Sequence, residues 1–226
     1  MENFHKRSQN ILIQEEERIV LPGSSTPLPY WGLECSDAVT FYSLEGNGQH
    51  YAEQGVTVDC TPSECRSKRD LSFVNGSGTL NVSIAVDGNV IHRTHKFQAT
   101  TQTELLDFVM RFVFPKTLFD KAVVAGDEVL HRDHNIYHQY ALSETCRDVV
   151  LTGSQLRVQI APDTIDCPKG FKPHLYVRDE KGYWIVHVRL LPAESVRTVT
   201  KLNYSFYNRA VPQFAQRLLD VVGVSR

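Results

Sequence analysis

The chain has 226 residues, 42% of them hydrophobic, which is enough to bury a core without metals or cross-links. Its formal net charge of −2 creates no positive field that would attract phosphates, which argues against a nucleic-acid partner. No stretch is long and apolar enough for a membrane-spanning helix, and the N-terminal region lacks the apolar segment of a secretory signal. We therefore expect one soluble cytoplasmic domain that spans residues 1–226.

The cysteines are scattered and odd in number, unlike the dense, even set of a secreted disulfide framework. Four residues separate Cys60 from Cys65, which does not match the two-residue spacing of a zinc knuckle. We expect free thiols at all five positions: Cys35, Cys60, Cys65, Cys146 and Cys167.

The first half of the chain contains one clear hairpin. Residues 79–86 alternate between apolar and polar, Asp87-Gly88 supplies a type I′ turn, and residues 90–99 form the returning strand. Segments 21–32 and 59–70 resemble surface loops, the second containing the basic run from Arg66 to Arg69. Weaker strand candidates are 10–20, 38–44, 56–60 and 71–74.

Two segments are predicted to be helical, near 101–114 and 211–222. In the first, Thr101 and Glu104 match a capping box, and an apolar stretch continues until Pro115. The second begins near Pro212, which suits a first helical turn, and ends at Gly223. Further strands are expected at 122–131, 136–141, 149–151, 156–160, 175–178, 183–191 and 198–204.

The expected fold class is α+β and mainly antiparallel β, with about nine to ten strands and the two helices. So many strands do not remain one open twisted sheet, which indicates a curved sheet, a barrel or a sandwich. An alternative is two similar halves, each of strands followed by a helix, divided near residue 115.

Several common catalytic motifs are absent from the sequence. There is no G-x-S-x-G elbow, no G-x-x-x-x-G-K-[ST] phosphate loop and no H-E-x-x-H zinc motif. These absences argue against the commonest nucleotide-dependent and hydrolytic chemistries, although a triad built from distant residues would leave no such motif.

Histidines cluster in a predicted hairpin that joins 122–131 to 136–141 through a loop at 132–135. Because side chains alternate along a strand, Asp127, His131 and His138 would share one face, as a two-histidine, one-carboxylate metal site requires. The alternative is an ordinary polar surface. In the earlier hairpin, His92 and His95 must lie on opposite faces, and His95 on the apolar face is expected to be a core residue.

A third hairpin is predicted to turn at 179–182, with His174 opposite His187. One face carries an apolar stripe that includes Trp184 and Val186. The other face combines aromatic, imidazole and cationic groups that could bind an anionic or carbonyl-bearing ligand, although a plain solvent-exposed face fits the same pattern. The residues of this polar face are His174, Tyr176, Arg178, Tyr183, His187 and Arg189.

The favoured function is a small-molecule pocket protein that acts as an isomerase, cyclase or lyase without a cofactor. His187 or His174 would transfer protons, with Tyr176 or Tyr183 as hydrogen-bond donor and Arg189 as anion anchor, supported by Arg178. The expected partner is a small organic, anionic ligand, with oligomer formation left open. Two alternatives remain: an enzyme that uses a divalent metal at Asp127, His131 and His138, and a non-catalytic assembly or scaffold protein.

Overall fold

A computed structural model describes residues 11–14, 18–24, 26–36, 40–45, 53–105, 107–124, 126–129, 136–141, 147–166, 171–192, 204–206 and 214–219. Two large antiparallel sheets dominate these residues. The six-stranded sheet has the order β13 (Ile136–Ala141), β16 (Phe171–Glu180), β17 (Tyr183–Pro192), β10 (Asp107–Pro115), β3 (Tyr30–Ser36) and β4 (Phe41–Ser43).

The nine-stranded sheet combines strands from both halves of the chain. Its order is β12 (Asp127–Val129), β11 (Lys121–Val124), β14 (Val149–Thr152), β15 (Arg157–Asp166), β19 (Phe214–Leu219), β8 (Val90–Ala99), β7 (Gly76–Asp87), β6 (Glu64–Phe73) and β5 (Glu53–Cys60). Two small sheets complete the structure: β1 (Leu12–Gln14) with β2 (Arg18–Val20), and β9 (Thr103–Leu105) with β18 (Tyr204–Phe206).

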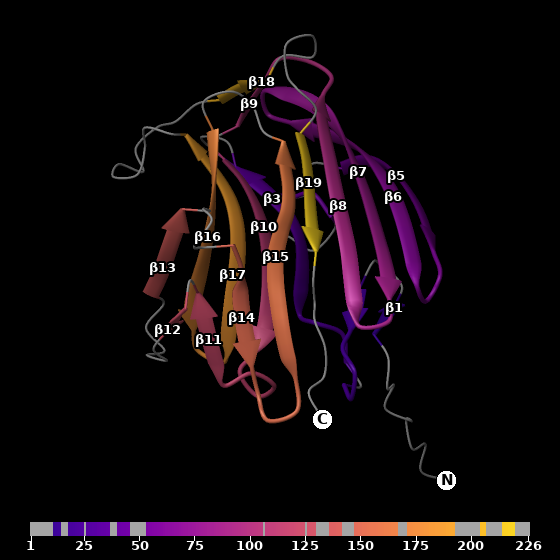
Figure 1. The fold of residues 1–226 in the computed structure, drawn as a ribbon. Coiled ribbons are helices and arrows are strands. Elements are labelled where there is room, and N and C mark those ends of the chain that lie inside the picture. The colour runs from indigo at the N-terminus through magenta and orange to yellow at the C-terminus, as the bar shows by residue number, and fades with distance from the viewer. Residues whose placement is uncertain are drawn as a thin grey trace.

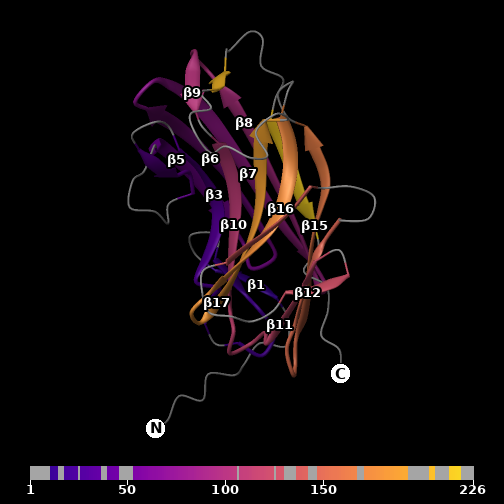
Figure 2. The same ribbon diagram turned by 90° about the vertical axis from the view of Figure 1, so that its left-hand side faces the viewer.

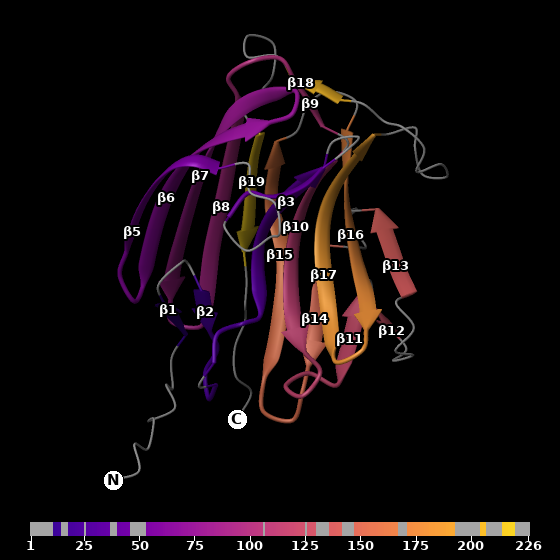
Figure 3. The same cartoon turned by 180° about the vertical axis from the view of Figure 1, so that it is seen from behind.

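The two large sheets pack face to face as a sandwich. The nine-stranded sheet faces the viewer in Figure 1. The six-stranded sheet faces the viewer in Figure 3, where the molecule is seen from behind. Aromatic pairs cross the core between them: the Phe97 and Phe108 ring centroids are 4.9 Å apart, and those of Tyr42 and Phe73 are 5.3 Å apart. The small sheet of β9 and β18 lies at one end of the sandwich (Figure 2).

A period of two in hydrophobicity explains most of these strands. Every second residue of β6 and β8 is buried, so each strand turns one face to the core and the other to solvent. Arg66 and Lys68 are exposed in β6, while Ser67 and Arg69 are buried. The predicted loop at 59–70 is therefore wrong, because most of this segment is strand.

The predicted helix near 101–114 is also wrong, because this segment forms β9 and β10. Phe108, Met110, Phe112 and Phe114 are buried at every second position, and β10 lies centrally between β17 and β3. A strand between two partners is partly buried on its second face as well, so apolar residues occur on both of its faces. This broadly apolar composition also fits a buried helix, which is why the sequence suggested one.

The predicted helix near 211–222 is replaced by β19, which runs between β15 and β8. A strand in this position pairs its backbone with both neighbours. These tertiary hydrogen bonds override the local helix signals at Pro212 and Gly223. No described residue is helical, and therefore no helix in the described part of the chain is long and apolar enough to cross a membrane.

The hairpin of β7 and β8 is confirmed, with His95 on the buried face. Its two-residue loop is Gly88-Asn89 and not the predicted Asp87-Gly88, so its register is also shifted by two residues. Gly88 has a φ of 57°, which favours glycine. The hairpin of β16 and β17 is also confirmed, but its loop is Lys181-Gly182. The register therefore differs by two residues from the predicted one, and a shift of two leaves every side chain on its predicted face.

The predicted hairpin that joins 122–131 to 136–141 is wrong. β12 pairs with β11 in the nine-stranded sheet, whereas β13 pairs with β16 in the six-stranded sheet. The alternation along each strand could not reveal this, because it defines faces but not the identity of the pairing strand.

Cys60 and Cys65 face one another across β5 and β6 and form a disulfide. The expectation of free thiols is therefore wrong for this pair. Tight antiparallel hairpins bring directly opposite residues together, which the sequence spacing alone did not indicate. Cys35 is a buried thiol, and Cys146 and Cys167 lie outside the described residues.

Candidate functional site

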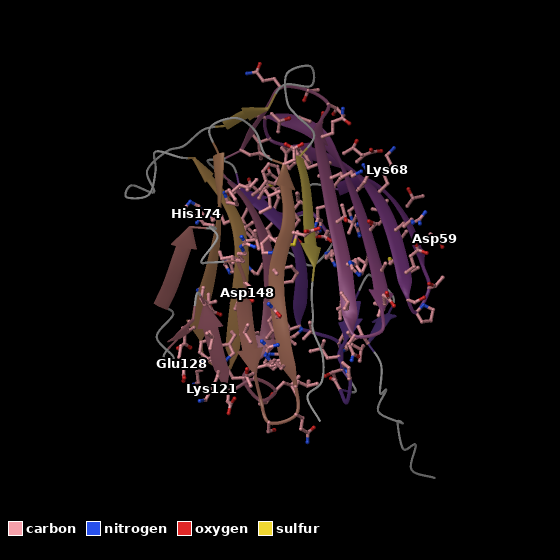
Figure 4. All side chains as sticks on the ribbon, viewed as in Figure 1. Asp59, Lys68, Lys121, Glu128, Asp148 and His174 are labelled. Carbon is pink, nitrogen blue, oxygen red and sulfur yellow. A yellow bond between two sulfur atoms is a disulfide. The ribbon has the colours of Figure 1, made fainter. Side chains whose placement is uncertain are left out.

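The outer face of the six-stranded sheet carries the polar residues that the sequence singled out. On β17, Trp184 and Val186 point into the core, so His187 and Arg189 point away from it. His174 on β16 lies directly opposite Arg189 and shares its face. Figure 4 shows His174 on β16.

The hairpin of β16 and β17 is held in place by contacts at its turn. The Lys116 backbone N–H donates to the Gly182 carbonyl at 2.9 Å, and the Lys116 ammonium pairs with the buried Asp179 carboxylate. The same ammonium lies 4.8 Å from the centroid of the Trp184 ring, whose indole N–H donates to the Phe119 carbonyl at 2.9 Å. These contacts hold the strands that present His174 and His187.

Both histidines are nearly inaccessible, each with 4% of its surface exposed. His174 and His187 therefore do not lie on an open solvent face, which was the alternative interpretation of this pattern. Buried titratable side chains gather at functional sites more often than exposed ones do.

Two further residues of this face were missed by the sequence reasoning. Arg111 on β10 lies directly opposite His187, and its guanidinium contacts the Glu34 carboxylate of β3 at 2.9 Å. The Glu34 side chain is 3% exposed, so this is a buried carboxylate held by an arginine. Arg111 was missed because its segment was predicted to be helical; no motif marks Glu34.

An aromatic ring borders the ion pair. The Arg111 guanidinium lies 5.6 Å from the centroid of the Phe41 ring on β4, and Phe41 is 40% exposed. The ring extends the site toward the β4 edge of the sheet. It offers an apolar surface beside the charged groups.

Electrostatics keeps one imidazole of the site neutral. Burial lowers the pKa of His187 well below 6.5, and the charges of Arg111, Arg178 and Arg189 lower it further. At neutral pH the ring is therefore unprotonated, which is the state in which a general base begins its reaction.

The remaining candidate residues of this face lie around that centre. Arg178 is half-buried and pairs with Glu180, and Tyr183 is 40% exposed at the hairpin end. Tyr176 lies opposite His187 in the register, but its side chain is outside the described residues. In the neighbouring strand β13, Gln139 is directly opposite Tyr176 in the register.

The three metal candidates are not brought together by the predicted hairpin. The side chains of Asp127 and His138 and the whole of His131 lie outside the described residues, and no metal-binding group occurs among the residues that are described. The metal site therefore stays a prediction, without the strand pairing on which it was based.

A second polar cluster lies inside the sandwich. Glu45 follows β4, and its carboxylate pairs with Arg93 and lies 2.8 Å from the His95 Nε2 atom. The Leu33 backbone N–H also donates to Glu45. Each of the three ionisable groups is at most 3% exposed. The cluster links the six-stranded sheet to β8 through the core, and it gives the His95 Nε2 atom a buried polar partner.

Comparison with known proteins identifies the fold. No protein-family model matches the sequence, and no curated protein matches it. Among solved structures, a putative aldose 1-epimerase from Escherichia coli K12 is similar, with a TM-score of 0.58, 6% identity, and coverage of 96% of this chain and 97% of that chain. A galactose mutarotase related enzyme from Lactobacillus acidophilus has a TM-score of 0.51 and 9% identity, with coverage of 85% and 78%. The chain therefore has a mutarotase-like, mainly antiparallel β-sandwich fold.

Proposed function

We propose that this protein is a cofactor-free isomerase that binds a sugar on the outer face of the six-stranded sheet. The observation that carries the proposal is the buried, neutral His187, which lies beside the ion pair of Arg111 and Glu34 on that face. The mutarotase-like fold supports a carbohydrate as the ligand class.

Interconversion of sugar anomers can be catalysed by proton transfers alone. A base removes the proton of the anomeric hydroxyl, the bond from the anomeric carbon to the ring oxygen breaks, and an acid gives the ring oxygen a proton. Rotation of the aldehyde and reversal of these steps give the other anomer, with no net change in atoms or electrons. A site with a neutral imidazole and a second titratable group has the parts for this reaction.

In this proposal His187 accepts the proton, and His174 serves as the second proton-transfer group. Tyr176 donates a hydrogen bond to the sugar. The Glu34 carboxylate, held by Arg111, binds sugar hydroxyl groups, since carboxylates accept strong hydrogen bonds.

The sugar is expected to carry an anionic group. Among the described side chains of this face, the positively charged ones outnumber the negatively charged ones: Arg111, Arg178 and Arg189 against Glu34 and Glu180. Arg189 would anchor the anion, because its planar guanidinium matches phosphate and carboxylate oxygens.

The test is the rate at which freshly dissolved α-anomers equilibrate, followed by polarimetry or proton NMR. The substrates are α-D-glucose, α-D-galactose and their 6-phosphates. His187→Gln should lower the catalysed rate by about 10²–10⁴-fold, the usual contribution of a general base. Arg189→Gln should weaken the binding of the phosphorylated sugars more than that of the neutral ones.

The control is Lys68→Gln, which alters an exposed side chain on the other sheet and should leave the rate unchanged. Figure 4 shows Lys68 at the far margin of the molecule from His174. If none of the sugars equilibrates faster with the wild-type protein than without it, the proposed reaction is wrong. If it does but His187→Gln is fully active, the assignment of the base is wrong.

A further inference from the structure

The strand β5 forms an open edge of the nine-stranded sheet. Within the described part of the chain it pairs on one side only, with β6. Figures 1 and 3 show it at the outer margin of the molecule, opposite the margin formed by β12 and β13. An open edge presents a row of backbone N–H and C=O groups to another strand.

Both faces of this strand are exposed. Residues 55–59 are all exposed, with Val56 at 42% and Val58 at 45%. The two valines lie opposite Arg69 and Ser67, which are buried, so they occupy the inner side of the sheet. β5 therefore extends beyond the part of the sheet that the core covers, and it exposes apolar side chains there.

Two common protections of an edge strand are missing from β5. Its sequence, EQGVTVDC, contains no proline and no lysine, which commonly prevent edge-to-edge pairing. The one bulge lies between Glu53 and Gly55, so the strand from Gly55 to Cys60 pairs regularly. At its other end the disulfide of Cys60 with Cys65 ties β5 to β6.

We propose that a second copy of this chain pairs antiparallel with β5, about a two-fold axis at Thr57. The segment Val56-Thr57-Val58 is palindromic, so this register places Val56 opposite the partner's Val58. Thr57 then lies opposite the partner's Thr57 on the outer side. Aliphatic and threonine pairs of this kind stabilise antiparallel strands.

The charged side chain of this segment is compatible with the register. With the axis at Thr57, Asp59 lies opposite the partner's Gly55, and no two like charges are directly opposite. Figure 4 shows Asp59 at this margin.

The resulting dimer would have one sheet that continues across both copies. The valines exposed on each copy would contact one another on its inner side. The candidate sugar site lies on the other sheet, so this interface and the proposed function are independent of each other.

The first test measures molecular mass in solution by light scattering across a range of concentrations. The wild-type protein should have twice the 25.7 kDa mass of one chain. Val58→Lys places a charge among the valines and should weaken dimer formation by at least tenfold. Val74→Lys makes the same change at a valine that is 61% exposed in the turn after β6, and it should leave the dimer intact.

The second test examines the register. Thr57→Cys should form a disulfide between copies under mild oxidation, whereas Gly55→Cys should not, because it faces the partner's Asp59. Circular dichroism establishes that each variant is folded. A wild-type protein with the mass of one chain at every concentration would overturn the proposal. So would a dimer that Val58→Lys does not weaken, or cross-linking by Gly55→Cys in place of Thr57→Cys.

Discussion

Arg111 on β10 lies directly opposite His187 on β17, and this pairing places a permanent positive charge beside a buried imidazole. The relationship connects two strands that are far apart in the sequence. Together with burial, this charge makes the pKa of His187 different in the folded and unfolded protein.

The first prediction concerns the pH dependence of stability. Burial, followed by the arginine charges, lowers the pKa of His187 in the folded protein well below 6.5. Below pH 6.5 the unfolded chain binds a proton that the folded chain does not, so the free energy of unfolding should fall with decreasing pH. The loss should approach about 1.4 kcal/mol per pH unit.

Urea unfolding at about pH 7.5 and about pH 5.5 measures this effect. His187→Gln cannot titrate, so its stability should decrease less between the two pH values than that of the wild type. An equal decrease in both proteins would show that His187 does not contribute.

The second prediction concerns the cluster inside the core. Glu45→Gln should lower the free energy of unfolding by about 3–5 kcal/mol, because it leaves the buried Arg93 charge without its carboxylate. Glu64→Gln is the matched control. Glu64 pairs with Arg66 at the surface, where an ion pair contributes about 0–1 kcal/mol. Chemical denaturation of both variants tests the difference, and equal losses would contradict it.

A third prediction follows from the β5–β6 hairpin. Peptide mapping after alkylation without reduction should recover Cys60 and Cys65 joined by a disulfide, as the structure has them. The buried Cys35 thiol should be alkylated only after unfolding. Recovery of Cys60 and Cys65 as two separately alkylated thiols would be the contrary result.

The metal alternative leads to a fourth prediction. If Asp127, His131 and His138 form a metal site, the purified protein should contain a stoichiometric divalent metal, and His138→Ala should remove it. Elemental analysis of both proteins tests this. A wild-type protein with no metal after preparation without chelators, and none bound on addition of zinc, would exclude the site.

The faces of the hairpin of β16 and β17 could be predicted from the sequence, although its register could not. Alternation identifies which residues share a face, and the shift of two residues left His174, His187 and Arg189 together. The presence of a mainly antiparallel β fold was confirmed for the same reason, since turn residues and alternation are local signals.

The other features of the fold and of the candidate site depend on contacts between segments that are distant in the sequence. The stretch from Asp107 to Pro115 looked helical because β10 is covered on its core face and partly covered on the other. Glu34 meets Arg111 only because β3 and β10 are adjacent in the sheet. The pairing of Glu45 with His95 spans 50 residues and the full thickness of the core, and no local pattern indicates it.

The cluster of Glu45, Arg93 and His95 also determines how far the two layers can slide against each other. Apolar side chains tolerate a small displacement, since the dispersion attraction that weakens on one side is partly restored on the other. A buried carboxylate that is hydrogen-bonded to a guanidinium, an imidazole and the Leu33 amide loses directional bonds when it moves by an ångström. The cluster therefore fixes the position of one sheet relative to the other. When a ligand binds to the outer face, the side chains there should change conformation while the strands beneath them keep their positions.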